Sequence, residues 1–245
     1  PHSQTRLELW LALPALALQG AWLLEEWSTL SFVDLGMAHA LNVFAFCTAL
    51  ILWLVCWRYP LRALGGVVYA VAAVCVAIAV WVNVGDVSSH PVGAKALEQM
   101  PLGLWLHIVS AMSAYAVLTL TAIQTLMVNA QDWRLRSHQA ARWQLPPLQT
   151  QETLLYGLCA VGWVLLSGTL VSGALFVQDL MAQHLAHKTV FTALAWLVLG
   201  VLLWLRWQRG LRGRRARLMV MLAYGLLVLA YFGSKFVLQV LLGRS

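Results

Sequence analysis

The chain has 245 residues, of which 61% are hydrophobic and only 10% are charged, and its mean hydropathy is +0.76. Soluble domains contain about 45–50% apolar and about 25% charged residues, so this composition excludes an ordinary soluble enzyme and a disordered chain. The apolar runs are long and unbroken, unlike the alternating strands of an outer-membrane barrel. A helix needs roughly 20 apolar residues to cross a bilayer. The sequence therefore predicts an all-α, polytopic transmembrane helix bundle that forms one domain over residues 1–245.

Seven membrane spans are predicted, and each one ends at charged or helix-breaking residues. Glu25 and Glu26 end the first span, because an unpaired carboxylate in hydrocarbon is costly. Pro146 and Pro147 prevent any helix from running through the fourth loop. The sixth loop, from Arg206 to Arg217, carries six arginines. In chain order the spans are roughly residues 7–24, 37–57, 63–84, 101–128, 152–178, 188–206 and 217–241.

The basic residues are distributed unequally between the two sides of the membrane. Twelve of the 16 Lys and Arg residues fall on the side of the N-terminus, and the other four are Lys95, Lys188, Lys235 and Arg244. By the positive-inside rule, the N-terminus is cytoplasmic and the loop that holds His184 and His187 is periplasmic. This topology in the inner membrane explains the net charge of +7 without a nucleic-acid partner.

Histidines gather on the predicted outer side, and three of them are candidate ligands. His107 is the foremost, because an ionisable residue inside an otherwise apolar helix is by default a functional hypothesis. His187 stands at the mouth of the sixth span, and His39 begins the second. Neutral imidazole is the natural axial ligand of haem iron, and two histidines on different helices can clamp one porphyrin. The alternative for each is an interfacial histidine, or one that is hydrogen-bonded to a neighbouring helix.

The sharpest site hypothesis is a haem b held between His107 and His187, which would also be the metal ligands. Lys188 and Lys235 would then lie within reach of the propionates, and the small residues of the fifth span would face the flat ring. The alternatives are that both lysines extend to the interface and that the small residues allow close helix packing. The six-arginine loop would bind acidic lipid or a cytoplasmic partner, or would act only as a topology signal.

Several other activities lack their sequence signals. The chain contains no HExxH, Walker loop, nucleophile elbow or paired intramembrane carboxylates, so a hydrolytic enzyme is not expected. A transporter is disfavoured because charged midplane residues and a visible inverted repeat are missing. The four cysteines lie in apolar runs without a CxxC or CxxCH motif, which argues against a thiol redox centre and a covalent haem site.

Five stretches of the chain together carry a family pattern. They are residues 106–115 (LHIVSAMSAY), 145–153 (LPPLQTQET), 187–196 (HKTVFTALAW), 210–215 (GLRGRR) and 231–235 (YFGSK). These resemble the cytochrome c assembly family of CcsA-like haem-handling membrane proteins, and most closely its YpjD inner-membrane branch, which is related to HemX. The resemblance implies that His107 corresponds to the family's first extracytoplasmic haem-ligating histidine. Relatives of this branch have a further helix before the first span, so eight spans are expected in the native product.

The sequence also departs from the pattern of true haem lyases. Their WWD segment is missing from residues 183–187 (QHLAH), their intramembrane histidine aligns with Trp204, and their second extracytoplasmic histidine falls near Leu242. The resemblance therefore implies a haem-binding or haem-handling protein, accessory to cytochrome c biogenesis or haem homeostasis, without covalent haem-lyase activity. The alternative is a non-catalytic scaffold or regulatory partner of another membrane complex that binds no haem.

Overall fold

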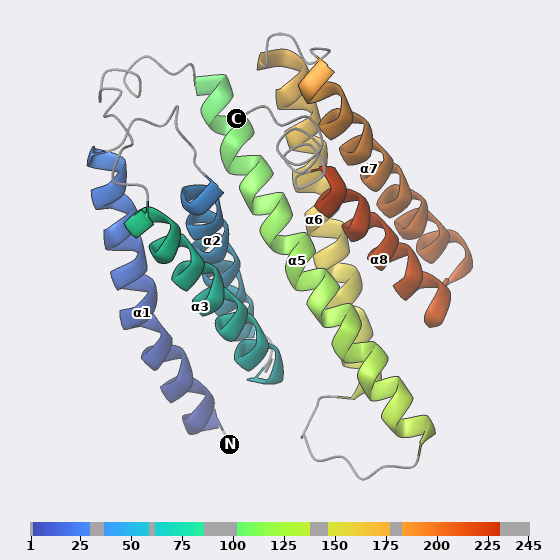
Figure 1. Ribbon diagram of the computed structural model, residues 1–245. Helices are drawn as coiled ribbons and strands as arrows, with labels where there is room; N and C mark the ends of the chain where they lie inside the picture. The colour runs from blue at the N-terminus through green and yellow to red at the C-terminus, as the bar shows by residue number, and fades with distance from the viewer. Residues whose placement is uncertain are drawn as a thin grey trace. The chain divides into compact units, whose positions relative to one another are not determined.

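The computed structural model describes residues 2–29, 37–58, 62–85, 102–137, 147–176 and 183–230, and the regular structure within these ranges is entirely helical. Each predicted span corresponds to one helix, so the all-α prediction is confirmed (Figure 1). The helices are α1 (His2–Thr29), α2 (Met37–Arg58), α3 (Arg62–Gly85), α5 (Leu102–Arg136), α6 (Leu148–Phe176), α7 (Gln183–Arg209) and α8 (Arg214–Val228).

Within the described ranges, three helices are long and apolar enough to cross a membrane. They are Leu102–Arg136, Leu148–Phe176 and Lys188–Arg209, and two shorter apolar stretches lie at Asn42–Trp57 and Val68–Ile78. Together with the composition, these helices make the chain a multi-pass membrane protein.

The chain divides into two compact units, Pro1–Leu102 and Gly103–Ser245, and a single domain over the whole chain stays a prediction. The first unit contains α1, α2 and α3. Small residues on α2 and α3, including Ala45 and Ala49, are buried beside Leu16 of α1, which lets the helices approach closely. The Gln19 amide donates a 3.1 Å hydrogen bond to the Asn42 side-chain oxygen, so one polar pair also joins α1 to α2.

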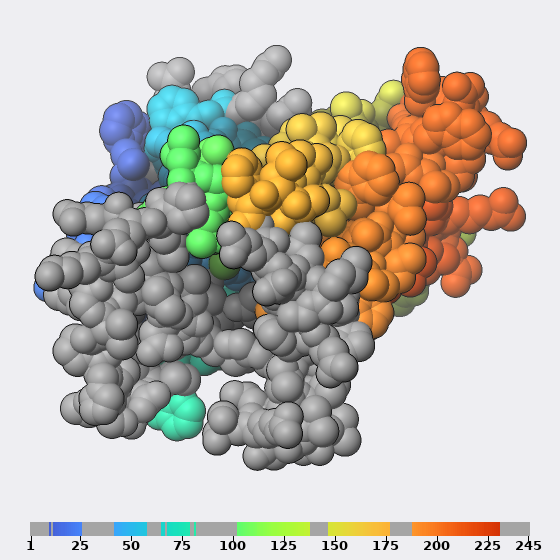
Figure 2. Space-filling view, turned by 90° about the horizontal axis from the view of Figure 1, so that it is seen from above, coloured from blue at the N-terminus to red at the C-terminus, as the bar shows by residue number. Residues whose placement is uncertain are grey.

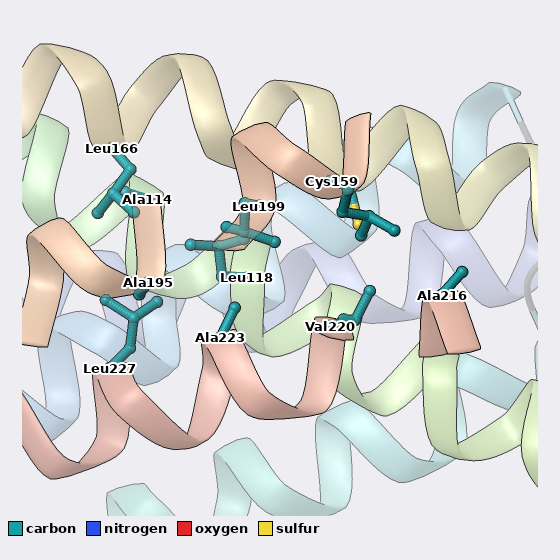
Figure 3. Packing of buried hydrophobic residues seen from close by; sticks show 11 residues of the cluster. Ala114, Leu118, Cys159, Leu166, Ala195, Leu199, Ala216, Val220, Ala223 and Leu227 are labelled. Atoms are coloured by element: carbon teal, nitrogen blue, oxygen red, sulfur yellow. The ribbon is translucent and has the colours of Figure 1, made fainter. Parts of the chain in front are cut away.

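The second unit packs α5, α6, α7 and α8 around one apolar cluster (Figure 3). Every helix contributes to it, and α8 supplies mostly small side chains that fit against α7. Cys159 is fully buried there and packs as a small hydrophobic residue. The buried members are Ala114, Leu118, Cys159, Leu166, Ala195, Leu199, Leu202, Ala216, Val220, Ala223 and Leu227.

Helices α5 and α6 run antiparallel, and glycines set their separation. A Cβ on Gly162 would lie 2.5 Å from Cδ2 of Leu118, so only glycine leaves room for that leucine. A Cβ on Gly103 would lie 2.2 Å from the Phe176 ring, so the start of α5 lies against the end of α6. Seen along the helices from this end, the two segments lie side by side in green and gold (Figure 2). Gly162, one of the small residues of α6, therefore allows close packing of α6 against α5.

The starts of α6 and α7 can be compared with the boundaries that the sequence predicts. α6 begins at Leu148, four residues before the predicted span and directly after the Pro146–Pro147 pair, which no helix was expected to cross. The Thr150 N–H donates to the Pro147 carbonyl at 2.9 Å. α7 begins at Gln183 rather than at residue 188. His184 and His187 therefore lie in the first turns of a helix and not in a loop, because Leu185 and Ala186 between them are good helix formers.

Candidate functional site

His107 lies in the second turn of α5 and is half-buried against α6. The space for its ring exists because residue 173 is glycine: a Cβ there would lie 3.0 Å from Cε1 and 3.4 Å from Nδ1 of the imidazole. Gly173 therefore accommodates the histidine, and any larger residue at that position would push the ring away from α6. His107 therefore faces α6, a neighbouring helix of its own unit.

The hydrogen bonds of His107 decide which ring nitrogen carries the proton. Nδ1 lies 3.1 Å from the Thr169 carbonyl oxygen, and a carbonyl can only accept, so Nδ1 carries the hydrogen. Nδ1 is also 3.1 Å from the Ser172 hydroxyl, which in turn donates to the same carbonyl at 3.2 Å. In the neutral ring Nε2 then keeps its lone pair. Nε2 makes no hydrogen bond to any described residue.

Two hydroxyls continue this contact between α5 and α6. The Ser110 hydroxyl donates to the His107 carbonyl at 3.0 Å, and the Thr169 hydroxyl lies 3.3 Å from the Ser110 oxygen. The Thr169 hydroxyl also donates to the Leu165 carbonyl at 3.0 Å. All four polar side chains at this level are neutral, and each makes at least one hydrogen bond within the unit.

The position of His187 along the bundle follows from the contacts of α6 with its two neighbours. The Trp196 indole donates to the Ser167 hydroxyl at 2.7 Å, and a Cβ on Gly200 would lie 3.1 Å from Trp163. This antiparallel register puts the backbone of His187 level with Phe176. Since Phe176 packs against Gly103, the backbones of His187 and His107 are about one helical turn, roughly 5 Å, apart along the helix axes.

The remaining predicted site residues are less completely described. Lys188 is half-buried in the first turns of α7 and is not without an interaction partner. The side chains of His187 and His39 are not among those described, and Lys235 lies outside the described residues altogether. His39 is in the first turn of α2 and belongs to the first unit, whereas His107 belongs to the second. Bis-histidine ligation and the propionate partners therefore stay predictions.

The described residues contain no group of three or more His, Cys, Asp or Glu side chains that could hold a metal ion. In this part of the chain, the candidate ligand groups are the imidazole of His107 and the neutral hydroxyls around it. Such a set suits the axial position of a haem, where the porphyrin already supplies most of the ligands, better than an isolated ion.

Polar contacts at the opposite end of the unit are of another kind. The Arg217 guanidinium is buried and lies 2.5 Å from an Asp132 oxygen, and Arg136 reaches the other side of this carboxylate at 3.2 Å. Nearby, the Gln151 amide donates to the Gln131 side-chain oxygen. The Arg217–Asp132 pair thus joins α8 to α5, and the Gln151–Gln131 hydrogen bond joins α6 to α5.

Sequence reasoning missed Thr169, Ser172 and Gly173 as partners of His107, and it missed the pair between Asp132 and Arg217. A signal for the first group existed in the small residues of the fifth span, since positions 162, 169 and 173 repeat at helical spacing. Nothing in the sequence shows which rotation of α6 presents that face to α5.

Comparison with known protein families supports the resemblance found in the sequence. The family described as Cytochrome C assembly protein matches residues 35–242, which is most of the chain and includes His107 and the arginine-rich loop. The chain belongs to the cytochrome c assembly family. Its helices and its relatives together make it a multi-pass protein of the inner membrane.

The relatives with curated names come from two bacteria. The chain is 32% identical over 176 residues to the inner membrane protein YpjD of Escherichia coli strain K12, which covers 71% of this chain and 64% of that protein. It is 35% identical over 147 residues to an uncharacterized 28.8 kDa protein of Azospirillum brasilense, covering 58% of this chain and 54% of the relative. The matches thus span less than two thirds of either relative. No solved structure matches the chain.

Proposed function

We propose that this protein binds haem b at the end of the α5–α8 unit where α5 begins, with Nε2 of His107 as an axial ligand. In this role it handles haem for cytochrome c biogenesis or haem homeostasis, from the periplasmic side of the inner membrane, and has no covalent haem-lyase activity of its own. The bound group would supply the iron and the porphyrin, and the chain would supply the ligand, its orientation and the surrounding apolar helices.

A single observation carries the proposal: the Thr169 carbonyl accepts a hydrogen bond from the Nδ1–H group of His107, with 3.1 Å between nitrogen and oxygen. Histidines that bind metals almost always donate their other ring N–H to a carbonyl, a carboxylate or water, which fixes the tautomer and the ring orientation. Here this second partner is already in place, and Nε2 is the nitrogen left for iron. The donor set of the described residues therefore fits a haem ligand.

His187 is the proposed second ligand. Its backbone lies about one helical turn from that of His107 along the bundle, and an imidazole is long enough to make up such an offset. Lys188, in the following position, and Lys235 are the proposed propionate partners, because a cation near the outer surface would pair with a carboxylate there.

The second candidate is a membrane scaffold or regulatory partner of another complex that binds no haem. One observation favours it: the hydrogen bonds of His107 to Thr169 and Ser172 join α5 to α6 without any ligand. On this view His107 is an interhelical hydrogen-bonding residue, and its removal would affect stability alone.

The test is a haem titration of the purified full-length protein in detergent, followed by absorbance in the Soret region. We expect the wild type to bind haem and His107→Ala to lose at least about tenfold in affinity, by analogy with metal sites that lose their supporting contacts. His138→Ala is the matched control, because it removes a histidine from the predicted cytoplasmic side. Equal binding by His107→Ala and His138→Ala would overturn the proposal in favour of the scaffold.

Gly173→Ala tests the same site without touching the ligand. The new Cβ would lie 3.0 Å from Cε1, so the ring must move by a few tenths of an ångström, and we expect this change in ring orientation to lower haem affinity about tenfold. Gly168→Ala in the same helix is the matched control, because a Cβ there meets nothing within 4 Å. If both variants bind haem equally well, the ring orientation set by α6 does not matter for ligation.

A further inference from the structure

The turn between α7 and α8 is held in a defined conformation. Gly210 has φ +62° and its N–H donates to the Arg206 carbonyl at 3.0 Å, while Gly213 has φ +79° and its carbonyl accepts from the Arg217 N–H at 3.2 Å. Both backbone conformations favour glycine over any other residue. The turn can therefore reverse the chain within four residues and bring the last arginines of α7 close to the first arginines of α8.

Tyr156 of α6 anchors this turn to the rest of the unit. Its hydroxyl donates to the Leu211 carbonyl at 2.8 Å, and the Arg206 guanidinium lies over its ring, 4.3 Å from the centroid. Arg206 is thus held below the turn by a cation–π contact. The arginines beyond it are presented from a fixed support and not from a free loop.

Four arginines at this turn have no acidic partner among the residues that the structure describes. Arg209, Arg212, Arg214 and Arg215 are all exposed. The described carboxylates of the same unit are Asp132 and Glu152, and neither lies within ion-pair distance of these four; Asp132 already pairs with Arg136 and Arg217. The positive charges of these four arginines repel one another, so an anion that pairs with several of them would relieve this repulsion.

The apolar residues that flank the turn indicate where that anion lies. Trp207, in the last turn of α7, is 82% exposed, and Trp204 is 54% exposed. Tryptophans at this level are typical of the interface between hydrocarbon and headgroups. On the α8 side, Leu218 and Leu222 are also exposed and continue directly from the arginines. A ligand at this place meets positive charge at one end and apolar surface at the other.

From this arrangement we infer that the α7–α8 turn is a binding site for anionic phospholipids of the leaflet that it faces. Phosphate groups pair with Arg209, Arg212, Arg214 and Arg215, and the acyl chains run along the exposed apolar residues of α7 and α8. Arg206 and Tyr156 are positioning residues. The turn lies at the opposite end of the unit from the start of α5 (Figure 1), and His107 is in the second turn of that helix, so this site is independent of the haem proposal.

The test is a lipid titration of the purified full-length protein by native mass spectrometry, with phosphatidylglycerol against phosphatidylcholine. Each arginine near an anionic surface contributes about fivefold in affinity, so Arg212→Gln with Arg214→Gln should weaken phosphatidylglycerol binding about 25-fold. Arg134→Gln with Arg136→Gln is the matched control, because it removes the same charge from the nearby end of α5. We expect that variant to lose less than about threefold.

Two further arms separate the lipid from other sources of phosphate and from general charge. Inorganic phosphate at millimolar concentration should not displace phosphatidylglycerol; full displacement would show a free-anion site and overturn the lipid assignment. Tyr156→Phe keeps the ring under Arg206 and the net charge but frees the turn, and we expect a loss of several-fold in phosphatidylglycerol binding. Equal losses in the two double variants, or equal affinity of the wild type for the two lipids, would overturn the inference.

Discussion

The two ends of the α5–α8 unit join helices through polar side chains in different ways. At the end with His107, four neutral side chains hydrogen-bond to one another and to a carbonyl, and one imidazole nitrogen is left over. At the other end, Arg217 is buried against Asp132, and the charges compensate each other. Polar residues inside the bundle are therefore not equivalent. The charged pair of Arg217 and Asp132 holds helices together, whereas the neutral set around His107 also leaves one imidazole nitrogen for a ligand.

The largest effect is expected from breaking the charged end. Asp132→Ala leaves the guanidinium of Arg217 buried without its carboxylate, and removing one partner of a buried pair costs about 3–5 kcal/mol. We expect the lower end, about 3 kcal/mol, because the Asp132 side chain is 21% exposed. The measurement is the free energy of unfolding in detergent by chemical denaturation.

Two controls sharpen this prediction. Combining Asp132→Ala with Arg217→Met removes both charges and should recover most of the lost stability. Arg136→Gln removes the exposed partner of the same carboxylate and should cost less than about 1 kcal/mol. An Asp132→Ala variant as stable as Arg136→Gln would mean that the buried pair does not hold α5 to α8.

A smaller effect is expected midway between the two ends, where apolar packing alone joins α5 to α6. Gly162→Ala would place a Cβ 2.5 Å from Cδ2 of Leu118, and such overpacking costs about 1–3 kcal/mol. Gly157→Ala adds the same methyl group to α6 where nothing lies within 4 Å, and it should stabilise the helix by up to about 1 kcal/mol. Thermal unfolding of the two variants, compared directly, measures the difference.

The smallest effect is expected at the neutral end. Ser172→Ala removes one of the two acceptors near Nδ1 of His107 but leaves the Thr169 carbonyl in place. We therefore expect a stability loss below about 1 kcal/mol and a change in haem affinity below about threefold. A loss of haem affinity as large as that of Gly173→Ala would show that the hydroxyl, and not the carbonyl, orients the ring.

Local features of the sequence determined the number and type of the helices. Each predicted span corresponds to a helix, because each contains a long apolar run. The Pro146–Pro147 pair set the start of α6. The polar residues before Lys188 predict a loop, but α7 begins at Gln183, because residues 183–188 include residues that form helices readily. His107 was also identified from sequence, since an ionisable residue stands out in an apolar segment.

Only the tertiary structure decided what these residues contact. His107 and Thr169 are 62 positions apart, and Asp132 and Arg217 are 85 apart. Which of them meet depends on the rotation and axial register of whole helices, which are set by many weak apolar contacts and by glycines such as Gly162 and Gly173. The same apolar composition would allow other rotations, so the sequence determined that a membrane bundle forms, while packing determined which nitrogen of His107 remains for a ligand.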